Sequence, residues 1–178
     1  LLFEERVGTI TVTYGEVNDT VTVTQSCRQQ NSVVAPYLLG EYYGDYARAN
    51  YNYYIVLSSS DYDANNPLYA AGWKYFLDIY ADTPPTDYNN IRIPNGVYTL
   101  TSNGGTANTL FDYYSIYQEY DNSGFKIYER TYAEATLTVT DDLVKLEILF
   151  EDSLDTYVVT YSGDYTIRDK RDMSGGVN

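Results

Sequence analysis

Alternation of apolar and polar residues over short segments is the feature that most constrains how this chain can fold. In Tyr51–Leu57 the odd-numbered side chains fall on one face of an extended strand and the even-numbered ones on the other. Residues typical of turns separate such segments, and none of them shows a sustained helical period. The segments with this alternation are Gly8–Tyr14, Thr20–Gln25, Tyr51–Leu57, Gly72–Ala81, Gly96–Leu100, Tyr113–Glu119, Thr131–Thr140, Leu143–Phe150 and Thr156–Tyr161.

These segments predict an all-β protein. The first two, joined by a short polar turn, predict an N-terminal β-hairpin with one apolar face. From about Pro36 to about Arg168 the chain is expected to form an antiparallel β-sandwich or flattened barrel, and the alternation does not choose between the two. Two similar stretches, YYGDY at Tyr42–Tyr46 and YSGDY at Tyr161–Tyr165, predict that the first and last strands lie antiparallel and remove exposed sheet edges.

Tyrosine dominates the aromatic residues, with 23 Tyr against 5 Phe and 1 Trp. Tyrosine favours strands and tolerates half-buried positions, because its hydroxyl can reach water or a polar partner. Most of these side chains are therefore expected to be structural. A minority on the surface would suit the stacking of sugar rings.

The formal net charge of −14 excludes some classes of partner. Nucleic-acid binding needs an excess of Lys and Arg to neutralise phosphates, so we expect no nucleic-acid partner. Adsorption to an anionic membrane surface is disfavoured for the same reason. No apolar run is long enough to span a bilayer and no signal peptide is evident, so we expect no direct membrane insertion by this chain.

The inventory of reactive residues argues against an enzyme. The chain has no His, which excludes Ser-His-Asp and Cys-His arrangements and His metal ligands, and it has no phosphate-binding glycine loop. Cys27 is the single cysteine, so no internal disulfide can form. The stretch DYDANN at Asp61–Asn66 has the spacing with which a calcium loop begins but not its later Gly and Glu, so it fails as a full calcium loop, and a partial oxygen site shared with distant residues is left open. We expect no catalytic residue, cofactor or dedicated metal site.

Sugar recognition is the binding chemistry that the composition suits best. It requires aromatic faces for the apolar side of a sugar ring and carboxylate or amide oxygens for its hydroxyl groups. Trp73 shares a strand face with Leu77 and Ile79, which also fits a position in the core, and the loop tyrosines could equally fold back over the edge of the sheet. The candidate ligand-binding residues are Tyr62, Tyr69, Asp61, Asp63, Asn65 and Trp73, with a second aromatic group at Tyr113, Tyr114, Tyr117 and Tyr120.

The N-terminal segment RVGTITVTYGEVNDTVTVTQS resembles the closing hairpin of a BACON module, an immunoglobulin-like domain of secreted Bacteroidetes proteins. The phrases YYGDY, NYYIVLSS, IPNGVYTL and TYSGDY resemble Tyr-rich β domains that follow such modules in surface and periplasmic lipoproteins. The resemblance implies a partial module at residues 1–27, a linker at 28–36, a Tyr-rich domain at 37–170 and a flexible tail at 171–178. It also implies export to the cell envelope and a setting of glycan capture, and it transfers no binding residue.

Two functions from different classes follow. The first is a non-enzymatic envelope domain that binds a polysaccharide or oligosaccharide, or that serves as a spacer in a glycan-capturing protein. The second is a structural or adhesive module whose partner is another protein. Exposed aromatic faces would favour the first, and a flat apolar patch or a free sheet edge would favour the second. The oligomeric state is left open.

Overall fold

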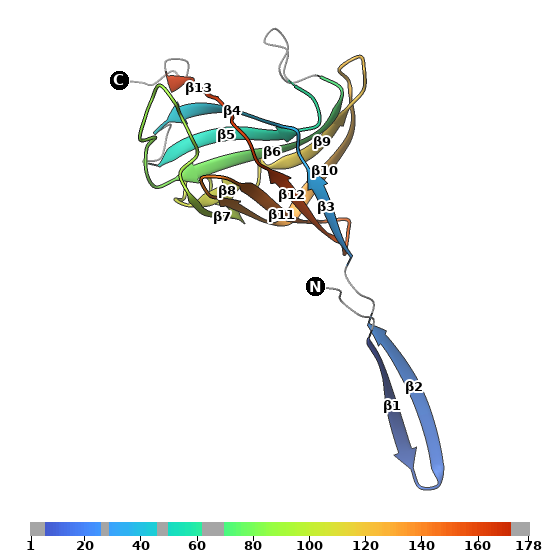
Figure 1. Ribbon diagram of the computed structural model, residues 1–178. Helices are drawn as coiled ribbons and strands as arrows, with labels where there is room; N and C mark the ends of the chain where they lie inside the picture. The colour runs from blue at the N-terminus through green and yellow to red at the C-terminus, as the bar shows by residue number, and fades with distance from the viewer. Residues whose placement is uncertain (1–5, 26–28, 46–49, 62–69, 172–178) are drawn as a thin grey trace.

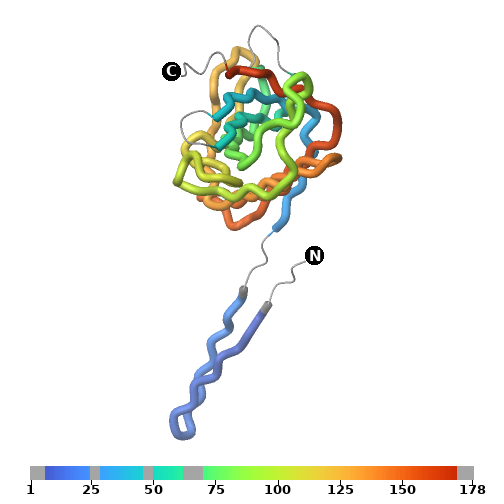
Figure 2. The backbone as a smooth tube through the Cα atoms, turned by 90° about the vertical axis from the view of Figure 1, so that its left-hand side faces the viewer, coloured from blue at the N-terminus to red at the C-terminus, as the bar shows by residue number. Residues whose placement is uncertain are grey.

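The computed structural model describes residues 6–25, 29–45, 50–61 and 70–171. These residues form thirteen β-strands and no α-helix, which confirms the all-β prediction. The strands belong to a separate two-stranded sheet and to an eleven-stranded sheet that curls into a barrel (Figures 1 and 2).

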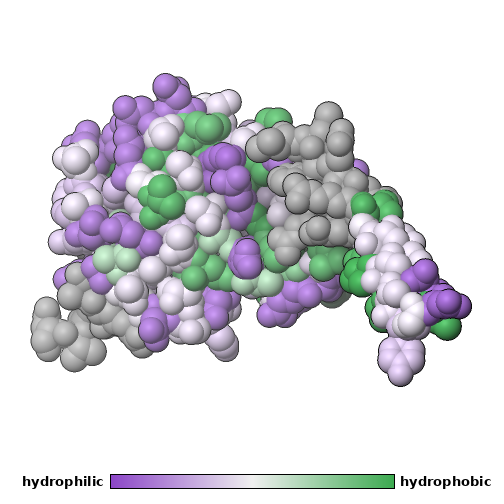
Figure 3. Space-filling view, turned by 90° about the horizontal axis from the view of Figure 1, so that it is seen from below, coloured by the Kyte–Doolittle hydropathy of each residue, from purple (hydrophilic) through white to green (hydrophobic). Residues whose placement is uncertain are grey.

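The two-stranded sheet is the predicted hairpin of β1 (Arg6–Tyr14) and β2 (Val17–Gln25). Its strands pair antiparallel in an unbroken register, and the hairpin projects away from the barrel (Figure 1). Alternation places threonines on one face and apolar side chains on the other, and hydrophobic surface is visible on the hairpin in Figure 3. These apolar side chains are all exposed, and they are Ile10, Val12, Tyr14, Val17, Val21 and Val23.

The barrel has two sides of three strands each, and three further strands lie between them. One side contains β4 (Tyr37–Gly44), β5 (Tyr51–Ser58) and β6 (Gly72–Ala81), and the other contains β10 (Lys126–Val139), β11 (Val144–Phe150) and β12 (Thr156–Tyr161). Both β6 and β10 change partners along their length. The first half of each pairs with β9 (Ile116–Tyr120), whereas the second half of β6 pairs with β8 (Thr109–Phe111) and that of β10 with β7 (Gly96–Thr101).

The barrel closes where two long chain paths run side by side. Strand β3 (Gln30–Val34) continues almost directly into β4, and β12 leads through a short loop into β13 (Ile167–Asp169). Strand β3 pairs with β12 and β4 pairs with β13, and both pairs are parallel, as is the pair of β7 and β8. The barrel thus begins with β3, inside the segment that the sequence predicted to be a linker.

The predicted antiparallel pairing of the two Tyr-rich repeats is wrong. Strand β4 pairs antiparallel with β5 and parallel with β13, where Ile167 lies opposite Gly40 and Asp169 opposite Tyr42, whereas Tyr161 of β12 lies opposite Val144 of β11. The YYGDY and YSGDY stretches do not pair with each other, and each contains a bend of the backbone instead. Gly44 has a φ of 77° at a register shift in β4, and a Cβ on Gly163 would lie 3.1 Å from the Tyr161 hydroxyl, so each bend requires a glycine.

One end of the barrel is closed by the segment between β6 and β7, which crosses the end that faces the viewer in Figure 2. Ile91 and Ile93 of this segment are buried in the core. Between them, Arg92 points outward, with its guanidinium carbon 4.4 Å from the centre of the Tyr165 ring and an ion pair to Asp164 at 3.3 Å. We call this the closed end.

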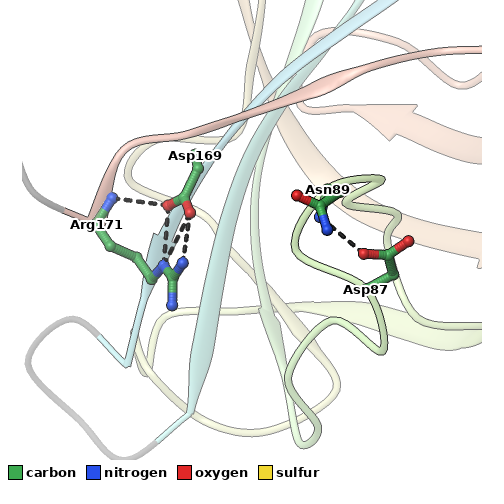
Figure 4. Close-up of polar contacts among 4 residues, drawn as sticks. All are labelled: Asp87, Asn89, Asp169 and Arg171. Carbon is green, nitrogen blue, oxygen red and sulfur yellow. Dashed lines mark hydrogen bonds and ion pairs between the residues drawn. The ribbon is translucent and has the colours of Figure 1, made fainter.

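The described C-terminal residues reinforce the closed end. Arg171 donates from Nε to Asp169 at 2.9 Å, and its guanidinium carbon lies 4.0 Å from the centre of the Tyr88 ring. Figure 4 shows this pair together with the turn in which the backbone N–H of Asn89 donates to Asp87 at 2.8 Å. Both ends of β13, the last strand of the described residues, are therefore held by contacts within the barrel domain.

Candidate functional site

The end of the barrel opposite the closed end is formed by the start of β6, the β9–β10 hairpin and the β11–β12 turn. Residues that face each other across an antiparallel pair project to the same side of the sheet. Trp73 lies opposite Glu119, and Tyr117 lies opposite both Tyr75 and Arg130. We call the inward-facing set here the aromatic end, and it consists of Trp73, Tyr75, Tyr117, Glu119, Tyr128, Arg130, Phe150 and Tyr157.

Aromatic rings run without a break from the core to the surface at the aromatic end. The ring of Trp73 is 5.5 Å from that of Tyr75, which is 4.8 Å from Tyr117. Tyr117 in turn lies 6.3 Å from Tyr128. Tyr75 and Tyr117 are buried, Trp73 is half-buried, and Tyr128 is 46% exposed. The inner rings therefore fix the positions of outer rings that a ligand could touch.

Glu119 places a carboxylate among these rings. Its Oε1 accepts a hydrogen bond of 2.5 Å from the Tyr117 hydroxyl, and this is its one hydrogen bond to the described part of the chain. Burial and the bond to Glu119 both raise the pKa of Tyr117, so the phenol stays protonated and remains the donor. The half-buried carboxylate keeps acceptor capacity for a further donor.

Arg130 is held in place by its neighbours. Its guanidinium carbon lies 3.7 Å from the centre of the Phe150 ring and 5.6 Å from that of Tyr157. Its Nε also donates to Asp152 at 2.8 Å, and its second guanidinium nitrogen reaches the same oxygen at 2.5 Å. Because the guanidinium is stacked on these rings and paired with Asp152, its position is fixed at the border of the site.

The structure places the predicted site residues differently. Trp73 is half-buried and packs against the core at the aromatic end, and Asp61 is exposed just after β5. Of the second aromatic group, Tyr117 belongs to the aromatic end and Tyr120 lies 5.5 Å from the buried Lys74 ammonium. Tyr62, Asp63, Asn65 and Tyr69 lie outside the described residues.

Sequence reasoning missed Glu119, Tyr128 and Arg130. The expected strand began at Thr131, whereas β10 begins at Lys126. A signal was present, because Tyr128, Arg130 and Tyr132 alternate with polar residues. The register shift between Tyr132 and Glu134 changes the phase of that alternation, and the later half of β10 buries Ala135, Leu137 and Val139 instead.

Lys74 is a buried charged residue near this end, and its side chain lies on the face of β6 opposite to Trp73 and Tyr75. It is fully buried, and its ammonium donates to the Ala70 carbonyl at 2.7 Å and to the Ser60 hydroxyl at 3.3 Å. Burial lowers its pKa. In the parts of the chain that the structure describes, no three metal-ligating side chains cluster together.

No family model, curated protein or solved structure matches the chain. Within the described ranges, no helix has the length and apolar character to cross a membrane.

Proposed function

We propose that this protein is a non-enzymatic, exported cell-envelope domain that binds a neutral glycan at the aromatic end of its barrel. The observation that carries the proposal is the run of rings from Tyr75 out to Trp73 and Tyr128, with the Glu119 carboxylate on the same side of the sheet. The proposed export is supported only by the sequence resemblance of the N-terminal hairpin to modules of secreted proteins.

Sugar rings present an apolar face of C–H groups and a perimeter of hydroxyl groups. The exposed faces of Tyr128 and Trp73 suit the first, and the free acceptor capacity of Glu119 suits the second. Because Tyr75, Tyr117 and Phe150 are packed beneath, these groups lose little conformational entropy on binding. The mouths of β-barrels are common places for ligand sites of this kind.

The charges favour a neutral glycan over an acidic one. Arg130 is already paired with Asp152, and carboxylates without a cationic partner also stand at this end, including Glu119 and Glu151. A uronic or sialic acid would meet net negative charge, because the cations among the described residues of this end, Lys126 and Arg130, are already paired with Glu129 and Asp152. Neutral hexose chains avoid this penalty.

The proposal can be tested by isothermal titration of the purified protein with a panel of neutral and acidic oligosaccharides. We expect one or more neutral members to bind, and Tyr128→Ala and Glu119→Gln each to weaken binding by about three- to tenfold. Tyr14→Ala is the matched control, since Tyr14 is 88% exposed on the hairpin. Unchanged affinity in both site variants would refute the location, and a preference for acidic glycans would refute the ligand class.

A second candidate function is protein binding through the N-terminal hairpin. Both of its strands have a free edge in the described structure, and its apolar face is uncovered there. An isolated two-stranded sheet is only marginally stable, so a face of this kind favours an adhesive or structural contact. If that contact is the function, Ile10→Asp should abolish assembly with the partner while leaving glycan binding at the barrel unchanged.

A further inference from the structure

The turn between β8 and β9 carries aromatic residues that the core does not use. Tyr113 is 73% exposed and Tyr114 is 53% exposed, although both lie in a turn of four residues, 112–115. Turns favour Gly, Asn, Asp and Ser, because these residues tolerate the required backbone conformations or hydrogen-bond to them. Two adjacent exposed tyrosines at such a position stabilise the fold very little.

The rings of this turn form a defined cluster with Phe111 at the end of β8. The planes of Phe111 and Tyr113 differ by only 28°, with their centres 6.1 Å apart. Tyr114 stands nearly perpendicular to both, 5.8 Å from Phe111 and 4.7 Å from Tyr113. Tyr113 is therefore stacked against Phe111, and Tyr114 stands edge-on to both.

Hydrogen bonds on both sides of the turn hold the cluster in place. The backbone N–H of Asp112 donates to the Thr101 carbonyl at 3.0 Å, and that of Ser115 donates to the Phe111 carbonyl at 3.1 Å. The buried Ser115 hydroxyl accepts a hydrogen bond of 3.0 Å from the backbone of Asp78, where β6 passes from β9 to β8 and its ladder is interrupted. The rings are thus presented by a backbone that is already ordered.

The loop before β8 packs against the same cluster. A Cβ on the buried Gly104 would lie 3.0 Å from the Phe111 ring, so the backbone of this loop touches the ring directly. The exposed side chains of the loop are hydroxyl and amide groups, Ser102, Asn103, Thr106 and Asn108. The flank of the rings formed by this loop is therefore polar and uncharged, and its hydroxyl and amide groups suit the hydroxyl perimeter of a sugar ring.

We propose that Phe111, Tyr113 and Tyr114 form a second carbohydrate-binding site, on the outer face of the barrel, that stacks a pyranose ring of a neutral glycan. Leu110 of β8 points into the core, so its strand neighbour Phe111 projects from the opposite, outer face of the sheet, whereas the rings of the aromatic end lie on the inner face. The proposal rests on the proposed function only for the class of ligand. A long polysaccharide could occupy both sites at once, so it would bind with higher affinity than a short fragment that reaches only one.

The test compares a neutral polysaccharide with short oligosaccharides of the same sugar, by affinity electrophoresis and isothermal titration. The variants are Tyr113→Ala/Tyr114→Ala, which removes exposed rings only, and Glu119→Gln at the aromatic end, with Tyr14→Ala as the control. We expect the double variant to lose about tenfold or more in affinity for the polysaccharide and to keep the oligosaccharide binding that Glu119→Gln weakens. Gly104→Ala should give a smaller loss, because it displaces the Phe111 ring.

The outcomes separate the two proposals. If only Glu119→Gln weakens binding, the second site is refuted and the aromatic end stands. If only Tyr113→Ala/Tyr114→Ala weakens binding, the second site is supported and the aromatic end is refuted. If the wild-type protein binds no neutral glycan, both are refuted.

Discussion

Replacing Asp78 by Asn should stabilise the protein at neutral pH and leave its stability nearly unchanged at pH 4. Asp78 is only 5% exposed on β6, where its Oδ1 accepts a hydrogen bond of 2.6 Å from the Asn52 amide. Burial raises the pKa of this carboxyl from 3.8 to about 6, although the Asn52 bond lowers it in part. The fold therefore tolerates the neutral acid better than the carboxylate.

The sign and size of the effect follow from the difference in proton affinity. Because the pKa is higher in the folded state, the folded protein binds the proton more tightly than the unfolded chain between pH 4 and 6. Stability from this group is complete below about pH 4 and is lost as the pH rises through about 6. At about 1.4 kcal/mol per pH unit, the interval from 3.8 to about 6 corresponds to a penalty of about 3 kcal/mol at pH 8.

Asn keeps an oxygen for the Asn52 amide, and its NH₂ group takes the place of the O–H of the protonated acid as a donor that needs an acceptor. We therefore expect Asp78→Asn to raise the free energy of unfolding by about 3 kcal/mol at pH 8 and to change it little at pH 4. Urea denaturation of both proteins at the two pH values measures this, with Asp142→Asn in an exposed turn as the control. A variant that is equally destabilised at pH 4 and pH 8 would refute the reasoning.

Three other substitutions test the packing of the barrel. Tyr53→Phe should raise the free energy of unfolding by about 1 kcal/mol in urea, because the buried Tyr53 hydroxyl has no hydrogen-bond partner among the described residues; a loss of stability would show that the hydroxyl is satisfied. Phe150→Ala should lower it by about 3–5 kcal/mol by opening a cavity and removing the ring under Arg130, and a loss below about 1 kcal/mol would contradict this packing. Gly44→Ala should lower it by about 1 kcal/mol in thermal denaturation because of the positive φ at the β4 bend, and a stabilising effect would rule that bend out.

The local alternation of residues predicts most strands but not how they pair. It locates β5, β6, β7, β11 and β12 to within a few residues, because each buries one or both faces through a period of two. It also locates β1 and β2, in which apolar residues alternate with threonines although both faces are exposed. The parallel pairs β3–β12 and β4–β13 join residues more than a hundred positions apart, and no local pattern encodes such a pairing. Alternation predicted a strand over Tyr113–Glu119, but its first three residues form a turn in which Ser115 caps the interrupted ladder at Asp78.

The candidate site shows the same limit. Residue type alone identified Trp73 as a candidate, and the structure shows it half-buried against the core at the start of β6. Glu119 and Arg130 become part of a site only because β9 lies between β6 and β10, which is a tertiary arrangement. The bulge after Tyr132 also shifts which residues face inward, so one pattern of alternation cannot fit both halves of β10.

The central claim is that a neutral glycan binds at the aromatic end, and the fluorescence of Trp73 tests it most directly. Trp73 is the only tryptophan in the chain, so emission excited beyond the tyrosine absorption reports on this end of the barrel alone. We predict that a neutral oligosaccharide from the panel shifts or enhances this emission in a saturable manner, and that Glu119→Gln moves the titration to higher concentration. Saturable binding measured calorimetrically with no change in Trp73 emission would contradict the account.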